Sequence, residues 1–407
     1  MLMKREGCNA MGTLRNSFER LFNSKKFNVI ALGVIAVIVL IAYSNTFTAS
    51  FHFDDTNSIE ENALIKRVTT DNIIAILKGV RPVVYLSIML NYQLSGLHVV
   101  GWHIFNIAFH IANSFFVYLL ISWTLSLKQF EKRHADKAKR MALFAALLFA
   151  VHPIQTEAVT YIISRTELLA TFFYLAALLL FIKGTQERKP LYYLGVLFSA
   201  LLSMGSKEWA VTLPAMLMLY DYMFLSERNV KNVLSHWQAY VLSALPWALI
   251  AHSLSLTSTG SNASLGFNIV TTSGITPVTY LLTSFNVLWT YVRLLILPIN
   301  QNLDYDYPIA KTLFEFPTFL SLLGHFVVVG VSFWLYKKRG WLLIPFGVAW
   351  FYIALSPVQS FVPIIDVIFE HRLYMPSIGF FLFFVVAYES FFEWMEAKYS
   401  FKKSEAV

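Results

Sequence analysis

Long apolar runs separated by short polar segments dominate this sequence. Several runs reach the roughly 20 residues that a helix needs to cross about 30 Å of hydrocarbon. They are rich in Leu, Phe and Ala, and they show too little strict alternation for barrel strands. The pattern therefore predicts an all-α polytopic membrane protein with about ten transmembrane helices, or eleven if one further apolar run also crosses.

The expected spans follow the apolar runs in order. We place them at about 27–43, 101–123, 141–158, 168–183, 190–204, 209–225, 237–256, 318–336, 341–356 and 373–392. The first has no small-residue cleavage site, so we expect a retained anchor rather than a signal peptide. The run at 277–298 is the eleventh candidate. We expect it to lie along the membrane surface or to re-enter, because a crossing would put Lys337, Lys338 and Arg339 outside, against the charge rule.

Basic residues set the orientation of these spans. They gather before the first span, in the loop 128–140 and at 337–339, and short basic loops are cytoplasmic under the positive-inside rule. The predicted parts are a basic cytoplasmic N-terminal segment (1–26), a membrane domain (27–392) and a short cytoplasmic tail (393–407). Within the membrane domain, residues 46–100 are expected to form a large first external loop.

Composition agrees with the membrane class. Hydrophobic residues make up 57% of the chain and charged residues 14%, with a mean hydropathy of +0.57, which a water-soluble globule would struggle to cover with polar surface. The net charge of +8 does not indicate nucleic-acid binding, because the cations occupy short loops beside spans. Cys8 is the only cysteine, which excludes internal disulfides and a thiolate metal cluster.

With this topology, most polar residues suited to chemistry fall on the external side. They come from the first external loop, the segment HPIQTEAVTYIISRTELLA, the turn SMGSKEWAVTLP and the run FEHRLYMPSIGF. The candidate site residues are Asp54, Asp55, Arg81, His152, Glu157, Arg165, Lys207, Glu208, Glu370, His371 and Arg372. A site built from them would face the exterior or the periplasm.

Glu157, Tyr161 and Arg165 recur at steps of four, which predicts that they stack along one helical face. They either form an ion pair with a tyrosine between, or leave Arg165 to bind an anionic group, since a charge near hydrocarbon is costly unless paired. His152 precedes Pro153 at the end of a predicted span. It is either a cap or interface residue, or a substrate contact.

Two further segments offer cations for a phosphate. Lys207 either pairs with its neighbour Glu208 or helps to bind a phosphate beside a helix N-terminus. Arg372, in the sequence Glu370, His371, Arg372 before the last span, can offer two parallel donors to a phosphate.

A polar stripe runs along the second predicted span. His103, Asn106, His110 and Asn113 recur at steps of three, four and three. We expect the stripe to face the bundle interior and to hydrogen-bond neighbouring helices. The spacing is not the i, i+4 pair of a zinc helix, so a metal site is not indicated.

The ordered motifs support a comparison with a known family. They are FDD, RPVVYLSIMLNY, GWHIFNIAFH, HPIQTEAVTYIISRTELLAT, SKEWAVTLP and EHRLYMPSIGF. Over about residues 27–392 the chain resembles the membrane part of the transmembrane and tetratricopeptide-repeat O-mannosyltransferases, within the glycosyltransferase C (GT-C) superfamily. It departs from them in stopping soon after its last predicted span without such repeats, so repeat-based binding of a protein acceptor is not carried over.

The resemblance implies inverting transfer of a sugar from a polyprenyl-phosphate carrier to an acceptor hydroxyl. The family's acidic pair matches Asp54, expected to be the general base, and Asp55, expected to position the acceptor or a cation. The expected phosphate-binding residues are Arg165, Lys207, Arg372 and Arg81. A divalent cation, Mg²⁺ or Mn²⁺, would fit between the acids and a phosphate, but hard oxygen ligands alone do not establish one.

The expected partners are a polyprenyl-phosphate-linked sugar, an acceptor protein or glycan, and membrane lipid, with no nucleic acid. The expected location is a bacterial inner membrane with a periplasmic site, or the endoplasmic reticulum membrane with a lumenal site if the chain is eukaryotic. Two other classes stay open. A lipid-linked sugar flippase or secondary transporter would place acids near mid-span, and a non-catalytic scaffold would use the external loop to bind a partner.

Overall fold

The computed structural model describes residues 26–130, 137–248, 251, 275–364 and 366–404. Several predictions lie outside these ranges: the basic segment up to residue 25 with Cys8, part of the basic loop after residue 130, and the Ser, Thr and Gly-rich loop 257–268. Within the described ranges the secondary structure is helical and contains no β-strand. The all-α class is therefore confirmed.

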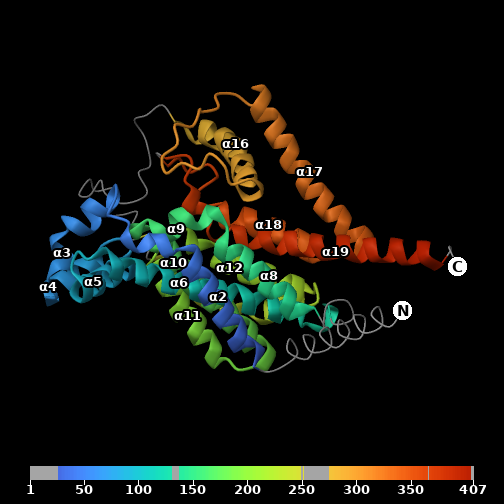
Figure 1. Cartoon of the computed structure of the whole chain (residues 1–407), viewed down its shortest axis with the longest axis horizontal. Coiled ribbons are helices and arrows are strands. Elements are labelled where there is room, and N and C mark those ends of the chain that lie inside the picture. The colour runs from blue at the N-terminus through green and yellow to red at the C-terminus, as the bar shows by residue number, and fades with distance from the viewer. Residues whose placement is uncertain (1–25, 131–136, 249–250, 252–274, 365, 405–407) are drawn as a thin grey trace, which may run out of the picture.

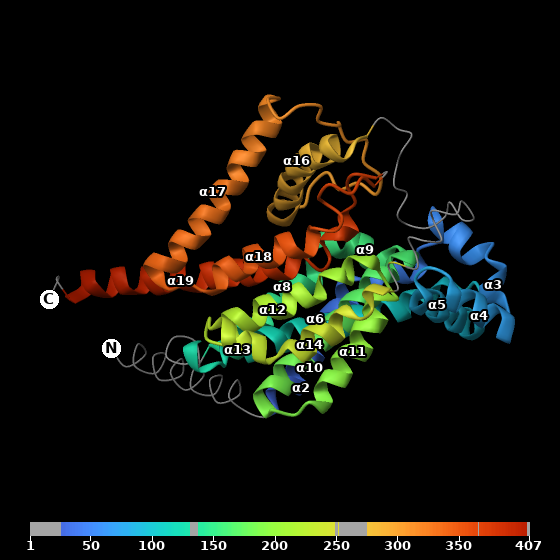
Figure 2. The same cartoon turned by 180° about the vertical axis from the view of Figure 1, so that it is seen from behind.

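Each predicted span contains a helix, and further short helices lie between the predicted spans. Their bounds are α2 Phe27–Ala42, α3 Ala63–Lys66, α4 Thr70–Lys78, α5 Pro82–Ser95, α6 Val99–Leu125, α8 Ala138–Val151, α9 Thr156–Thr160, α10 Arg165–Glu187, α11 Leu191–Met204, α12 Leu213–Tyr220, α13 Val230–Ser235, α14 Trp237–Ala244, α16 Pro277–Ile296, α17 Phe316–Arg339, α18 Leu343–Leu355 and α19 Ser377–Ser404. Helices α2, α6, α8, α10, α11, α12 and α14 form an elongated bundle beside which α18 and α19 pack (Figures 1 and 2).

The number of membrane crossings is not confirmed at ten. Within the residues that the structure describes, three segments are long and apolar enough to cross: Val99–Leu125, Ile162–Glu187 and Phe316–Arg339. A fourth results if Ala138–Val151 and Pro153–Thr160, bent by 53°, form one broken span. The remaining apolar helices fall short of 18 residues. They are Phe27–Ala42, Leu191–Met204, Leu343–Leu355 and Ser377–Phe392.

Helix α10 lies at the centre of the bundle, where it packs against α6 and α11. In its most apolar stretch 67% of the residues are buried inside the protein. Gly184 allows the close contact with α11, because a Cβ at this position would come within 2.8 Å of the Tyr192 side chain. In contrast, only 11% of the corresponding stretch of α17 is buried. Helix α17 rests on α16 and α18 and diverges from the bundle (Figure 1).

Residues 46–100, which the sequence predicts to be the first external loop, form a folded unit of short helices. Helices α3, α4 and α5 lie at one end of the bundle (Figure 1), over a small apolar cluster of their own that includes Ile59, Ile65, Ile88 and Trp102. Because Trp102 belongs to α6, this cluster fixes the loop to the bundle. The loop is therefore held in a defined position beside the polar ends of the spans.

The polar stripe of α6 faces the bundle interior, as predicted. His103, Asn106, His110 and Asn113 are all buried. His110 contacts the Tyr374 hydroxyl at 2.7 Å and the Ala150 carbonyl at 2.9 Å, while Asn113 donates to the Leu168 carbonyl at 2.9 Å. The stripe therefore joins α6 to α8, α10 and the segment before α19, which is the packing role that the spacing indicates.

Candidate active site

The predicted helical face of Glu157, Tyr161 and Arg165 does not exist, because the chain breaks between them. Helix α9 ends at Thr160, Tyr161 has the extended values φ −71° and ψ 115°, and α10 begins at Arg165 after one 3₁₀ turn. The break leaves backbone groups without helical partners, and such groups need others when they are buried. The Asn106 amide donates to the Val159 and Ile162 carbonyls at 3.2 and 3.3 Å.

Asp55 supplies the other partner at this break. Its Oδ1 accepts a hydrogen bond from the Ile163 N–H at 2.8 Å, and its Oδ2 accepts one from the His52 N–H at 3.1 Å. The side chain is buried, and burial raises the pKa of the carboxyl to about 6. Asp55 therefore fixes the loop after α2 to the start of α10.

Asp54 is held differently from its neighbour. It is exposed, and its backbone N–H donates to the Tyr161 hydroxyl at 2.9 Å. Phe53 has φ 47°, in the left-handed region that non-glycine residues rarely adopt, and its side chain is 66% exposed. The unusual turn presents Asp54 at the surface while Asp55 points inward.

Four ionisable residues form a connected cluster in which two acids alternate with a histidine and a lysine. We call Glu157, His371, Glu167 and Lys207 the charge network. The two oxygens of Glu157 meet the backbone N–H of His371, at 2.8 Å, and its ring Nδ1. His371 Nε2 lies 3.9 Å from Glu167 Oε1, and this same oxygen accepts a hydrogen bond from Lys207 Nζ at 2.7 Å. Burial lowers the pKa of Lys207. Segments far apart in sequence therefore meet at one buried cluster.

A buried acid, Glu208, and a partly buried cation, Arg81, form a second ion pair beside the charge network. Arg81 Nε donates to Glu208 Oε1, and Arg81 Nη2 donates to Glu208 Oε2, both at 2.9 Å. The hydrogen bonding is therefore bidentate. Arg81 has φ 56°, again in the left-handed region. The interpretation that Lys207 and Glu208 pair with each other is wrong, because their hydrogen-bonded partners are Glu167 and Arg81.

Arg372 follows His371 in the sequence and interacts electrostatically with Asp366. Burial raises the pKa of Asp366. Arg372 and His371 oppose this rise, and Asp304 and Asp54 add to it, so each of these four groups is within electrostatic range of Asp366. The Arg372 guanidinium lies 5.2 Å above the Phe369 ring. Its Nη1 is buried and makes no hydrogen bond within the described residues. Arg372 therefore keeps an unused donor, and Asp366 is electrostatically coupled to both Arg372 and Asp54.

Arg165 is inaccessible in this structure. It is completely buried between the Phe105 and Trp102 rings, at 4.3 and 5.0 Å, and donates to Asn91 Oδ1 at 2.8 Å. Such packing stabilises a desolvated cation. Of the expected phosphate-binding residues, Arg165 is the one most enclosed by protein, and its charge supports the neighbouring Asp55.

Two candidates have partners outside the charge network. His152 Nδ1 accepts a hydrogen bond from the Ile154 N–H at 3.2 Å, which is the capping interpretation of this residue. Glu370 accepts hydrogen bonds from Gln301 Nε2 at 2.6 Å, from the Asn302 N–H at 2.7 Å and from the Tyr305 hydroxyl. Glu370 therefore fixes the segment after α16 to the segment before α19.

The most important residue that the sequence analysis did not single out is Glu167. It connects Lys207 with His371, and its Oε2 accepts a hydrogen bond from Trp209 Nε1 at 2.6 Å. The sequence does contain an indication of its importance. Glu167 lies two residues after Arg165, at the start of a long apolar run, and an ionisable residue in such a run is a functional candidate by default. Asp366 belongs to the same predicted external side but was given no role, because nothing in its local sequence shows that it interacts with Arg372.

A divalent cation was left open by the sequence. Among the residues that the structure describes, no group of three or more His, Cys, Asp or Glu side chains is arranged to hold a metal ion. Arg372, Asp304 and Asp54 each act electrostatically on Asp366.

Comparison with known proteins found no matching family model and no matching solved structure. Curated relatives do match. The chain is 26% identical over 386 residues to Protein O-mannosyl-transferase F38B6.6 of Caenorhabditis elegans, which covers 88% of this chain and 51% of that relative. It is 31% identical over 231 residues to Protein O-mannosyl-transferase TMTC2 of Homo sapiens, covering 51% of this chain and 26% of the relative.

A third relative, Protein O-mannosyl-transferase TMTC4 of Homo sapiens, is 27% identical over 225 residues, which is 49% of this chain and 30% of the relative. The chain thus spans about half, or less, of the length of these curated relatives. The resemblance to the transmembrane and tetratricopeptide-repeat O-mannosyltransferases, predicted from the ordered motifs, is confirmed by these matches.

Proposed function

We propose that this protein is a membrane glycosyltransferase that moves a sugar from a polyprenyl-phosphate donor to an acceptor hydroxyl. The observation that carries the proposal is the arrangement around Asp54. The exposed Asp54 carboxylate lies within electrostatic range of Asp366, a carboxylate that Arg372 and His371 also influence, at the end of the bundle where the folded segment 46–100 packs. The names of the relatives make mannose the first donor sugar to test and a protein hydroxyl the first acceptor.

Asp54 is the proposed general base. A hydroxyl is a weak nucleophile until a positioned carboxylate takes its proton in the transition state. The acceptor oxygen would form a bond to the anomeric carbon while the bond from that carbon to the phosphate oxygen breaks, and the hydroxyl proton would pass to Asp54. A single displacement of this kind inverts the anomeric configuration. No step is assigned to a metal ion.

Arg372 is the proposed partner of the leaving phosphate. Negative charge gathers on the phosphate as the sugar departs, and preorganised donors in a site of low dielectric stabilise it strongly. The free Nη1 of Arg372 supports this role, whereas the best hydrogen bonds of Arg81 and Lys207 are made to Glu208 and Glu167. We propose that Lys207 and His371 add positive potential and that Arg81 and Arg165 hold the framework.

The remaining acids and the location complete the proposal. Asp55 fixes the catalytic loop, and the polyprenyl chain of the donor remains in the membrane. We propose that the site opens on the external face, which is the periplasm in a bacterium or the lumen of the endoplasmic reticulum in a eukaryote. This face follows from the positive-inside rule applied to the basic loops.

The test uses membranes that contain the full chain, supplied with a panel of radiolabelled polyprenyl-phosphate sugars and peptide or glycan acceptors. We expect transfer from at least one donor by the wild type and its loss in Asp54→Asn. The matched control is Asp71→Asn, because Asp71 is an exposed acid on α4 of the same folded loop. Undiminished transfer by Asp54→Asn would remove the assignment of the base. Movement of the lipid-linked sugar across the membrane without transfer would replace the proposal with a flippase.

A further inference from the structure

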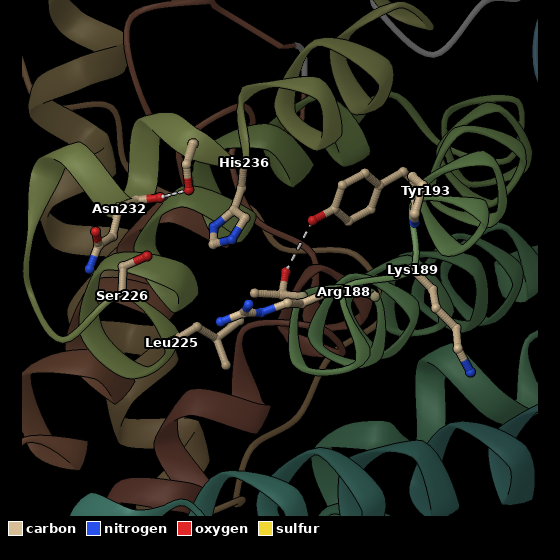
Figure 3. A pocket seen from close by; sticks show the side chains of 11 residues that line it. Arg188, Lys189, Tyr193, Leu225, Ser226, Asn232 and His236 are labelled. Atoms are coloured by element: carbon tan, nitrogen blue, oxygen red, sulfur yellow. Dashed lines mark hydrogen bonds between the residues drawn. The ribbon is translucent and has the colours of Figure 1, made fainter.

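A polar cavity lies at the end of the bundle opposite the candidate active site. It has a volume of about 520 Å³ and is bounded by the end of α10, the start of α11 and helix α13. Figure 2 shows α13 at the opposite end of the bundle from α3, α4 and α5. The lining includes Arg188, Tyr193, Asn232, Ser235 and His236 (Figure 3). We call this cavity the Arg188 pocket.

Arg188 is the cation of this pocket. It ends α10 with φ 54°, in the left-handed region, so the chain turns sharply there. Figure 3 shows its guanidinium extending among the lining residues, while the Lys189 ammonium points away from them. Lys189 pairs with Glu187 at 2.9 Å, whereas no ion pair involves Arg188 within the part of the chain that the structure describes. The Arg188 guanidinium, without an acidic partner among the described residues, thus faces a cavity large enough to hold a small ligand.

The opposite wall supplies neutral donors around a fully paired acid. Asp221 is completely buried, and its carboxylate meets His236 Nδ1 at 2.7 Å, the Ser226 hydroxyl at 2.7 Å and the Tyr240 hydroxyl. This carboxylate holds the His236 ring by Nδ1, which leaves Nε2 as its remaining polar atom. Asn232 adds a side-chain amide to the lining, and the Ser235 hydroxyl donates to the Asn232 backbone carbonyl at 2.6 Å. Cationic and neutral donors together suit a phosphate.

An exposed apolar surface begins next to this polar cavity. On α11, Leu191 is 75% exposed and Phe198 is 63% exposed; Leu234 of α13 and Trp237 and Val241 of α14 are also exposed. Helices α11 and α14 pack side by side. A free anion would use only the cavity, but a ligand with a phosphate headgroup and hydrocarbon tails would cover both surfaces.

We propose that the Arg188 pocket binds the phosphate of an anionic phospholipid headgroup, with the acyl chains lying along α11 and α14. The neighbouring basic residues Arg228 and Lys231 agree with this placement, because cations near the ends of membrane helices attract anionic lipids. This site does not depend on the proposed glycosyl transfer and lies away from Asp54.

To test this, the purified full chain in neutral detergent is titrated with dioctanoyl phosphatidylglycerol. Binding is measured by tryptophan fluorescence and by the change in unfolding temperature. Dioctanoyl phosphatidylcholine and inorganic phosphate form the other two arms. Saturable binding of phosphatidylglycerol is expected, with much weaker binding in both other arms. Equal protection by inorganic phosphate would show a free-anion site, and equal binding of phosphatidylcholine would show a headgroup-independent lipid surface. Either result overturns the proposal.

The variants separate a defined site from general surface charge. Arg188→Gln is expected to weaken phosphatidylglycerol binding about tenfold or more, as expected for losing a charge-assisted hydrogen bond. Asn232→Leu changes no charge and should also weaken binding. The matched control is Lys183→Gln, which removes one exposed positive charge from α10 outside the pocket lining and should leave binding intact. Equal weakening by Arg188→Gln and Lys183→Gln would contradict the proposal.

Discussion

Asp54 and the charge network lie at the same end of the bundle but are held in opposite ways. Asp54 is exposed, and its side chain makes no hydrogen bond within the described residues. Glu157 and Glu167 are buried, and each meets two or more donors. Since an accessible carboxylate can meet a substrate and a buried paired one cannot, we infer that Asp54 performs chemistry and that the charge network holds the site in shape. Substitutions in the two regions should therefore separate activity from stability.

The largest expected effect is on stability, in Glu167→Gln. This change leaves Lys207 buried without its hydrogen-bonded acid, and breaking a buried ion pair by removing one partner costs roughly 3–5 kcal/mol. The measurement is the thermal unfolding of the purified variant in detergent. An unfolding temperature equal to that of the wild type would show that the charge network does not hold the fold.

The next effect is on transfer, in Arg372→Gln. Removing a donor that stabilises developing charge lowers turnover by about 10²–10³-fold, while the unfolding temperature should change little. Arg67→Gln is the matched control, because Arg67 is exposed in the same external region. If Arg372→Gln unfolds easily and its remaining folded fraction transfers sugar normally, Arg372 belongs with the framework instead.

Asp55→Asn tests the loop anchor through its pH dependence. Burial raises the pKa of Asp55 from 3.8 to about 6, so the folded protein binds the proton more tightly than the unfolded chain. The contribution of Asp55 to stability must then increase as the pH falls from about 7 to 4. The difference in unfolding temperature between wild type and variant should be larger at pH 5 than at pH 7. A difference that grows as the pH rises would have the sign of a lowered pKa and contradict the assignment.

The smallest effect is expected for Glu187→Gln, at the opposite end of the bundle. Glu187 pairs with Lys183 at 3.8 Å and with Lys189 at 2.9 Å, but all three side chains are substantially exposed. Exposed ion pairs contribute little to stability. Neither transfer nor the unfolding temperature should change measurably. A loss comparable to that of Glu167→Gln would mean that burial does not distinguish the two ends.

Helices and their inward polar stripes could be predicted from the sequence because both depend on local periodicity. Each apolar run is helical where the structure describes it, and the stripe from His103 to Asn113 faces inward. The break at Tyr161 could not be predicted in this way, since no proline or glycine marks it. It is stabilised by Asp55 and Asn106, which come from other segments.

The pairing of charges depends on contacts distant in sequence. Arg81 meets Glu208, and Glu157 meets His371, across separations of 127 and 214 residues. A single sequence shows which ionisable residues interrupt apolar runs, but not which of them meet. For this reason it named Glu157, Lys207 and His371 without their partners, and one of its two alternatives for Lys207 paired that residue with the wrong acid.

The central claim is that the accessible carboxylate of Asp54 takes the acceptor's proton. The most direct measurement is the single-turnover rate of sugar transfer by purified Asp54→Asn, taken together with its unfolding temperature. We expect a rate lower by about 10²–10⁴-fold, the usual contribution of general acid–base catalysis, with wild-type stability. A variant that transfers sugar at the wild-type rate would contradict the account.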